Sequence, residues 1–150
     1  MYRFALRMLK NEEDARDVAQ ETLVKVLRNL HRYDADRAFS TWVFGIARNA
    51  CIDEHRKRRR RAWDEPKDVV DQSPGPLVEV SRAQRAERLR LALDQLSPMY
   101  QEVLVLYHFE HLKYVEISET LEVPLGTVMN RIFRARKKLR NIYEAEGGEL

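Results

Sequence analysis

Residues 114–140 contain two short runs of helical apolar spacing that are separated by a tight turn. Pro124 suits the beginning of the second helix, because a residue in the first helical turn needs no free N–H. Polar and basic residues fill the other positions of the second helix, so one side can pack while the opposite side meets a polyanion. This layout is typical of a helix-turn-helix whose second helix enters the major groove of DNA. The residues expected to face inward are Val115, Ile117, Ser118 and Leu121 in the first helix and Leu125, Val128, Ile132, Ala135 and Leu139 in the second.

The outward side of the second helix carries residues that suit DNA. Arg and Asn side chains can hydrogen-bond to base edges, and further cations can neutralise phosphates. The alternative is a basic amphipathic helix that keeps the protein soluble or contacts an acidic partner. The outward residues are Asn130, Arg131, Phe133, Arg134, Arg136, Lys137, Lys138 and Arg140.

The tripeptide Gly126-Thr127-Val128, followed by Arg131 and by Arg134-Ala135-Arg136, resembles a known family of DNA-binding domains. The family is the extracytoplasmic-function (ECF) group of bacterial RNA polymerase sigma factors, in the sigma-70 family, whose C-terminal domain reads the −35 promoter element. The resemblance implies that the −35 contacts are Thr127, Asn130, Arg131, Phe133, Arg134 and Lys137.

Two positions depart from the family pattern. Met129 stands where the family usually has a polar or basic residue, so base readout there is expected to differ. Glu122 stands where the turn usually has Gly, which predicts a strained or differently shaped turn because non-Gly residues rarely adopt positive φ.

The first half of the chain also shows helical spacing. Residues 1–9 are expected to be the end of a helix, and Asn11 suits an N-cap with Asp14 as the carboxylate three residues later. A polar break at residues 31–38 separates the next helix, residues 12–30, from a third helix that begins near Phe39. The expected inner faces are Ala15, Val18, Ala19, Thr22, Leu23, Val26, Leu27 and Leu30 in the second helix and Trp42, Val43, Ile46, Ala47, Ala50 and Cys51 in the third.

Two stretches of this half, residues 14–21 and residues 39–49, resemble the promoter-melting domain of the same ECF sigma factors. In that family the first of these helices docks on a coiled coil of the largest polymerase subunit, and the following loop and helix handle the −10 element. Without the resemblance, the same residues would be an ordinary solvated helix face. The implied contacts are Asp17, Gln20, Glu21 and Arg28 with core polymerase, and Tyr33, Asp34, Arg48, Asn49, Arg56, Lys57 and Arg58 with the −10 DNA.

Melting DNA requires a place for an unstacked base. Flipping a base costs a few kcal/mol, and stacking on an aromatic side chain returns about 1–3 kcal/mol. Tyr33, with Asp34 and Asn49, could form such a pocket, although Tyr33 could equally be a packing residue. Trp42 is expected to belong to the core.

Composition indicates an all-α fold with two small helical domains. The chain has 150 residues, 34% of them charged, and no useful run of strand-like alternation. Residues 62–80 hold three of the five prolines and an acidic excess, so they are expected to be a flexible linker that extends at most ~65 Å at ~3.4 Å per residue. The expected organisation is residues 1–61 as a melting and polymerase-binding domain that lacks the usual start of its first helix, 62–80 as the linker, and 81–150 as the helix-turn-helix domain. The helix-turn-helix domain is expected to begin with helices over residues 81–96 and 99–109, the second of them started by Ser97-Pro98. The residues of the first of these helices expected to face inward are Ala83, Ala86, Leu89, Ala92, Leu93 and Leu96.

Charge is unevenly placed along the chain. The net charge is only +3, yet residues 56–61 are six consecutive cations and residues 131–140 contain six more. Two basic blocks indicate two separate contacts with a polyanion, although residues 56–61 could instead be a disordered or localisation-type tract.

Other classes of function are not favoured. Asp53 and His55 have no third ligand at zinc spacing, so no metal or cofactor is expected, and no nucleophile–base pair indicates an enzyme. The single cysteine, Cys51, is expected to be buried and reduced, and the lack of a signal peptide or long apolar run indicates a cytoplasmic protein with no membrane insertion.

These observations predict a transcription initiation factor. Its expected partners are core RNA polymerase and promoter DNA and, because of the family resemblance, an anti-sigma protein. The alternatives are a stand-alone helix-turn-helix regulator that binds duplex DNA without polymerase, and a helical protein that grips RNA or a partner through its cations alone.

Overall fold

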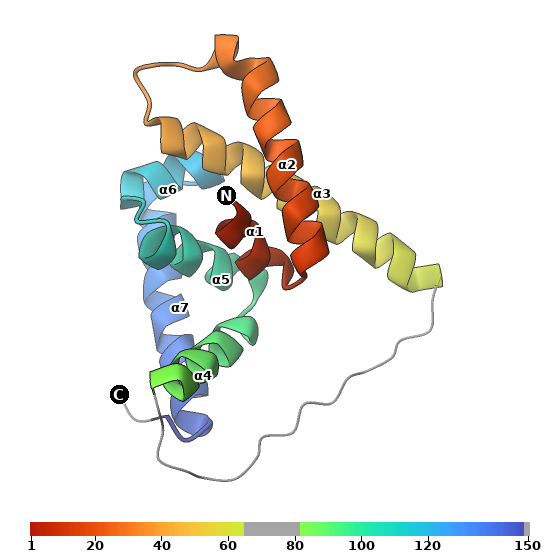
Figure 1. Ribbon diagram of the computed structural model, residues 1–150. Helices are drawn as coiled ribbons and strands as arrows, with labels where there is room; N and C mark the ends of the chain where they lie inside the picture. Colours follow the sequence, from red (N-terminus) through yellow and green to blue (C-terminus); the bar gives the residue numbers. More distant parts are fainter. Residues whose placement is uncertain (65–81, 149–150) are drawn as a thin grey trace.

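A computed structural model describes residues 1–64 and 82–148, and all regular structure in these two ranges is helical (Figure 1). The all-α prediction is therefore confirmed. Helix α3 continues to Asp64, and the remainder of the expected linker lies outside the described residues. The elements are α1 (Tyr2–Leu9), α2 (Glu12–Asn29), η1 (Leu30–Arg32), α3 (Phe39–Asp64), α4 (Arg82–Asp94), α5 (Pro98–Leu104), η2 (Val105–Phe109), α6 (Tyr114–Leu121) and α7 (Leu125–Ala145).

The first half packs α1 and α3 against α2. Asn11 is the N-cap of α2, as predicted, and its side chain accepts a hydrogen bond of 2.9 Å from the backbone N–H of Asp14. Helix α1 is short, yet it buries Phe4, Met8 and Leu9 because it lies between the other helices of its own half and α5 and η2 of the second half. Helix α1 therefore belongs to the interior of the whole molecule.

The second half is built around α7, which contacts α4, α5 and α6. Val103, Leu104, Val128 and Ile132 are each at most 1% exposed and form the centre of this contact. Burial of such side chains is worth about 1.5–3 kcal/mol each, which holds the long α7 against two short helices. The interior side of α7 therefore agrees with the predicted helical stripe, except at its first residue.

The turn between α6 and α7 has the strain predicted for Glu122. That residue has φ 54° and ψ 43°, a left-handed conformation that costs a non-Gly residue about 1–3 kcal/mol. The turn is closed by two hydrogen bonds that join Ser118 and Val123: one from the Val123 N–H to the Ser118 carbonyl, 3.1 Å, and one from the Ser118 hydroxyl to the Val123 carbonyl, 2.5 Å. Pro124 was predicted to lie in the first turn of α7, but it is the N-cap, and the helix begins at the next residue, Leu125. The Pro124 carbonyl accepts the N–H of Thr127 at 2.9 Å.

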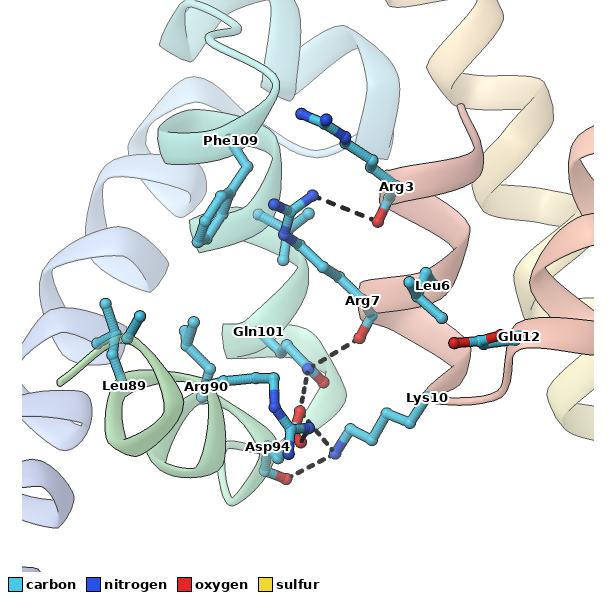
Figure 2. Close-up of a pocket in the computed structure, with 13 residues that line it drawn as sticks. Arg3, Leu6, Arg7, Lys10, Glu12, Leu89, Arg90, Asp94, Gln101 and Phe109 are labelled. Atoms are coloured by element: carbon cyan, nitrogen blue, oxygen red, sulfur yellow. Dashed lines mark hydrogen bonds and ion pairs between the residues drawn. The ribbon is translucent and has the colours of Figure 1, made fainter. Parts of the chain in front are cut away.

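The two halves share one apolar core, and beside it they touch along a polar contact that we call the seam. The seam is formed by Arg7 of α1, Lys10 directly after it, Arg48 of α3, Asp94 of α4, and Gln101 and Glu102 of α5. Arg48 forms an ion pair with Glu102, whose side chain is only 8% exposed. Gln101 donates a hydrogen bond of 3.1 Å to the Arg7 carbonyl, and the Lys10 ammonium donates one of 2.7 Å to the Asp94 carbonyl. Beside these bonds a groove of about 660 Å³ opens between α1, α4, α5 and η2 (Figure 2).

Several residues expected to face inward are exposed. On α2 the burial of Ala15, Val18, Thr22 and Val26 confirms the prediction, but Leu23, Leu27 and Leu30 were wrongly placed inside, because α2 packs only through the narrow side that faces α1 and α3. The start of α4 is also exposed. The exposed residues that were predicted inside are Leu23, Leu27 and Leu30 at 49, 72 and 50%, Val115 at 55%, Leu125 at 42%, and Ala83, Ala86 and Leu89.

Candidate nucleic-acid interface

The outward side of α7 presents most of the residues predicted to contact the −35 element. Asn130, Phe133, Arg134 and Lys137 are exposed on the side opposite the buried Val128, Ile132 and Ala135. Within residues 1–64 and 82–148, no hydrogen bond or ion pair engages the side chains of Asn130, Arg134 or Lys137. These groups are therefore available to base edges and phosphates.

Two other cations of α7 are held by aromatic residues on its flanks. Arg136 lies over the ring of Tyr107 at 5.2 Å, and Lys138 lies over the ring of Tyr100 at 5.1 Å. Burial, reinforced by the nearby Arg136 guanidinium, lowers the pKa of His108 below its ordinary value, so His108 adds little positive charge near neutral pH. The cationic character of this surface therefore comes from α7 itself.

Arg131 and Thr127 are half-buried and do not lie with the exposed group. Arg131 lines a smaller cavity of about 350 Å³, together with Arg48 and Glu102 of the seam. Arg131 was predicted to contact the −35 element and Arg48 the −10 element, yet both lie near the carboxylate of Glu102. The positive charges of both residues, acting on the Glu102 carboxyl, oppose the effect of its burial.

An aromatic cluster of Tyr33, Phe39 and Trp42 lies where the −10 residues were predicted. The ring of Tyr33 is 5.2 Å from that of Phe39 and 5.3 Å from that of Trp42, and its hydroxyl donates a hydrogen bond of 2.6 Å to the Arg37 carbonyl. Asn49 is exposed two helical turns after Trp42, so both residues lie on the same side of α3. Asp34 organises the preceding loop, because its carboxylate accepts the N–H of Asp36 at 3.0 Å.

Sequence reasoning missed Phe39 as a member of this surface, although it is 48% exposed. It had been regarded only as the start of a helix. The signal was available in the sequence, because Phe39 and Trp42 are three residues apart and such residues are neighbours on a helix surface.

The basic block is partly engaged within the first half. Arg58 donates a hydrogen bond of 3.0 Å to the Leu9 carbonyl and lies 3.5 Å from the Asp14 carboxylate. Lys57 is paired with Glu54 at 3.4 Å, and Arg56 lies 3.8 Å from Asp53. The pair of Arg56 with Asp53 is exposed, weak and screened, so Arg56 can exchange this partner for a phosphate at little cost. Glu54 is buried, so the pair of Lys57 is more firmly held.

The four residues predicted to bind polymerase, Asp17, Gln20, Glu21 and Arg28, are all exposed on one side of α2. Beside them lie the exposed Leu23, Leu27 and Leu30, a group that sequence reasoning assigned to the core. Adjacent residues such as Val26 and Leu27 cannot share one side of a helix, and this was the signal that some leucines must face outward.

Asp53, His55 and Cys51 are the residues that the sequence raised for chemistry other than DNA contact. Residues 1–64 and 82–148 contain no group of three or more His, Cys, Asp or Glu side chains that could hold a metal ion. Burial raises the pKa of the Cys51 thiol to about 12, and the nearby Glu102 carboxylate adds to this effect. His55 contacts the Met8 carbonyl at 3.0 Å. Within the same residues no helix is long and apolar enough to cross a membrane.

Comparison with known proteins agrees with this geometry. Residues 1–61 match the model of sigma-70 region 2, and residues 86–139 match that of sigma-70 region 4. The ECF RNA polymerase sigma factor SigE of Mycolicibacterium smegmatis is 36% identical over 99% of this chain, which spans 59% of that protein's length. SigW of Bacillus subtilis is 31% identical over 93% of this chain and 81% of its own length.

A solved structure has the same fold. The sigma factor RpoE of Bartonella quintana, in complex with the anti-sigma factor NepR, superposes with a TM-score of 0.76 at 23% identity, over 95% of this chain and 89% of that one. The motifs, the fold and the relatives agree, and the chain belongs to the ECF group of the sigma-70 family of RNA polymerase sigma factors.

Proposed function

We propose that the chain is a transcription initiation factor that binds core RNA polymerase, recognises the −35 and −10 elements of promoters and assists promoter melting. The observation that carries this proposal is the presence of three different exposed surfaces on one small chain. They are the polar and apolar side of α2, the aromatic cluster with Asn49, and the cationic outward side of α7.

The surface of α2 suits core polymerase. Leu27 is 72% exposed, and Leu23 and Leu30 are each about half exposed, so α2 and the start of η1 together present three exposed leucines. Exposed apolar groups with a polar border mark protein contacts. Asp17 and Arg28 on the border would fix the register of docking through charge-assisted hydrogen bonds.

The surface of α7 suits the −35 duplex. Asn130 and Arg134 would donate hydrogen bonds to base edges, and Lys137 would neutralise a phosphate. The N-terminal part of the second helix of a helix-turn-helix is the part that contacts base edges, and Asn130 lies in that part, one turn before Arg134.

The aromatic cluster suits the −10 element. Tyr33 and Phe39 offer ring faces or edges to an unstacked base, and Asn49 on the same side of α3 offers a hydrogen-bonding amide. Asp34 follows Tyr33 in the loop before α3, and the cations of the basic block, further along α3, would hold the phosphates of the opened strand.

The two DNA surfaces require the halves of the molecule to separate. Elements named −35 and −10 are about 25 base pairs apart, or about 85 Å at ~34 Å per turn of B-DNA. In the structure α3 is in direct contact with α6, and Thr120 of α6 lies 3.5 Å from the Thr41 carbonyl. The seam must therefore open when the chain binds polymerase and promoter. Such a factor would act in the cytoplasm, and a partner that holds the seam closed, as an anti-sigma factor could, would inhibit it.

The test is a run-off transcription assay with the purified chain, bacterial core polymerase and a pool of promoter templates. Discrete transcripts that share −35 and −10 sequences are expected. Leu27→Ser should weaken binding to core polymerase, and Arg134→Ala should reduce promoter use about tenfold or more, since one good base contact is worth about 1–3 kcal/mol. Arg85→Ser, a substitution of an exposed cation of α4, is the matched control and should change neither. Specific duplex binding by the chain alone, without transcripts, would instead favour a stand-alone regulator.

A further inference from the structure

An apolar row runs along the first two turns of α7, outside the core. Leu125, Met129 and Phe133 are 42, 53 and 71% exposed. They are spaced four residues apart, so their side chains lie one above another on the helix surface. The core of the second half is formed by other residues of α7, chiefly Val128 and Ile132, so packing within the described chain does not account for this row.

The surroundings of the row indicate DNA as the occupant. Asn130, Arg134 and Lys137 lie beside it, and α7 contains no acidic residue before Glu144. A protein partner for an apolar row does not require such a positive border, whereas a phosphate backbone does.

Gly126 is a second indication that another molecule approaches the start of α7 closely. A Cβ atom at this position would meet no other atom within 4 Å, so nothing in the fold requires a glycine there. Glycine in a helix is less favourable than alanine by about 1 kcal/mol. A glycine that costs stability and relieves no internal clash, placed next to Leu125 at the start of the reading helix, leaves room for a backbone from another molecule.

The chemistry of the major groove then restricts what the row can read. Met and Phe side chains cannot donate hydrogen bonds to base edges, and the only apolar group that an unmodified base pair presents in this groove is the C5-methyl of thymine. Residues four apart on a helix are separated by about 6 Å along its axis, which corresponds to about two base-pair steps. Met129 and Phe133 can therefore meet methyl groups of different base pairs.

We propose that Met129 and Phe133 make this chain select thymines in the −35 element, by apolar contact with their C5-methyl groups in place of hydrogen bonds. This inference rests on the proposed function, because it assigns a base preference to the same reading helix. Leu125 lies at the end of the row and shields the contact from water.

The test removes methyl groups from the DNA and leaves the protein unchanged. Promoters identified by run-off transcription are rebuilt with deoxyuridine in place of one −35 thymidine at a time, and each competes with its parent template in the same reaction with core polymerase and the full chain. Burial of one methyl-sized group corresponds to about a fourfold change, so about a fourfold preference for the thymidine template is expected at one or more positions. Met129→Ala or Phe133→Ala should abolish the preference at its own position, whereas Val115→Ala, on an equally exposed residue of α6, should leave it unchanged.

Each outcome decides between the two proposals. Transcripts that are equally abundant from thymidine and deoxyuridine templates at every −35 position would overturn the thymine-methyl inference and leave the initiation function intact. A fourfold preference that persists in both alanine variants would also overturn it. An absence of any promoter-specific transcript would overturn the proposed function itself.

Discussion

Helix α5 makes two contacts of opposite character. Toward α7 it presents Val103 and Leu104, which are at most 1% exposed and meet apolar side chains. Toward α1 and α3 it presents Gln101 and Glu102, which are also buried but are satisfied by a carbonyl and a guanidinium across the seam. Helix α5 is therefore joined to its own half by apolar packing. Its contact with the other half adds polar bonds to the apolar core that Phe4, Met8 and Leu9 of α1 share with the second half.

The difference between the two contacts is their response to water. Exposing apolar surface to water costs about 25 cal/mol of free energy per Å², so the contact of α5 with α7 can open only if the second half unfolds. The polar groups of the seam can exchange their partners for water, and an ion pair such as that of Arg48 with Glu102 has a desolvation cost that offsets much of its attraction. A groove also lies beside the seam, lined by residues of both halves (Figure 2). We therefore expect the polar bonds of the seam to exchange for water without unfolding either half, whereas the apolar contacts of α1 with the second half oppose separation.

The largest expected effect lies in the apolar contact. Ile132→Ala should lower the free energy of unfolding by about 2–5 kcal/mol, because Ile132 is 1% exposed and its removal leaves a cavity between α7 and α5. Phe133→Ala, at the neighbouring and outward position, should change it by no more than about 0.5 kcal/mol. Urea denaturation followed by circular dichroism measures both. Similar losses for the two variants would show that the outward side of α7 is packed in solution.

This pair of residues shows what the sequence could predict. Helical periodicity alone separates Ile132 from Phe133, and a local rule placed the cap at Asn11, because both features depend on residues close together in the chain. The strain at Glu122 was expected from the family resemblance, since the family usually has Gly in that turn. The predictions failed where periodicity was too permissive. The stripe drawn on α2 included both Val26 and Leu27, which point in different directions, and the leucines proved to be exposed.

The seam could not be predicted in the same way. Arg48 and Glu102 are 54 positions apart, and each has an ordinary local context as a polar residue on a helix. Nothing in either helix indicates that the two side chains meet, because their pairing depends on how the halves pack. For the same reason Arg48, assigned to DNA by resemblance, is engaged inside the molecule in the closed arrangement.

A smaller effect is expected from breaking the seam. Glu102→Ala removes the carboxylate that Arg48 and Arg131 approach, and the loss should be about 1–3 kcal/mol, since both guanidinium groups can still reach water. Cys51 lines the cavity of about 350 Å³ that also contains Arg48, Glu102 and Arg131, so opening of the seam should expose the Cys51 thiol. Alkylation of Cys51 by iodoacetamide at constant pH, followed by mass spectrometry, should therefore be faster in the variant than in the parent chain.

A neutral variant provides the control for this experiment. Glu102 also helps to raise the pKa of the Cys51 thiol, so its removal could increase reactivity without any opening. Gln101→Ala breaks the hydrogen bond to the Arg7 carbonyl and changes no charge. Faster alkylation in both variants would establish opening, and faster alkylation in Glu102→Ala alone would contradict it.

The smallest expected effect distinguishes the two contacts by pH. Burial raises the pKa of Glu102 above its ordinary value, an effect larger than the opposing influence of Arg48 and Arg131. The folded chain therefore binds the Glu102 proton more tightly than the unfolded chain, and the resulting stabilisation is complete below the ordinary glutamate pKa of about 4.5 and is lost as the pH rises through the raised value. Glu102→Gln stays neutral throughout. The stability of the parent chain relative to this variant should consequently fall with rising pH across that window, as measured by urea denaturation at a series of pH values. A relative stability that rises instead would mean that the ion pair with Arg48 outweighs the effect of burial on Glu102. The charged Glu102 would then stabilise the contact between the halves at neutral pH.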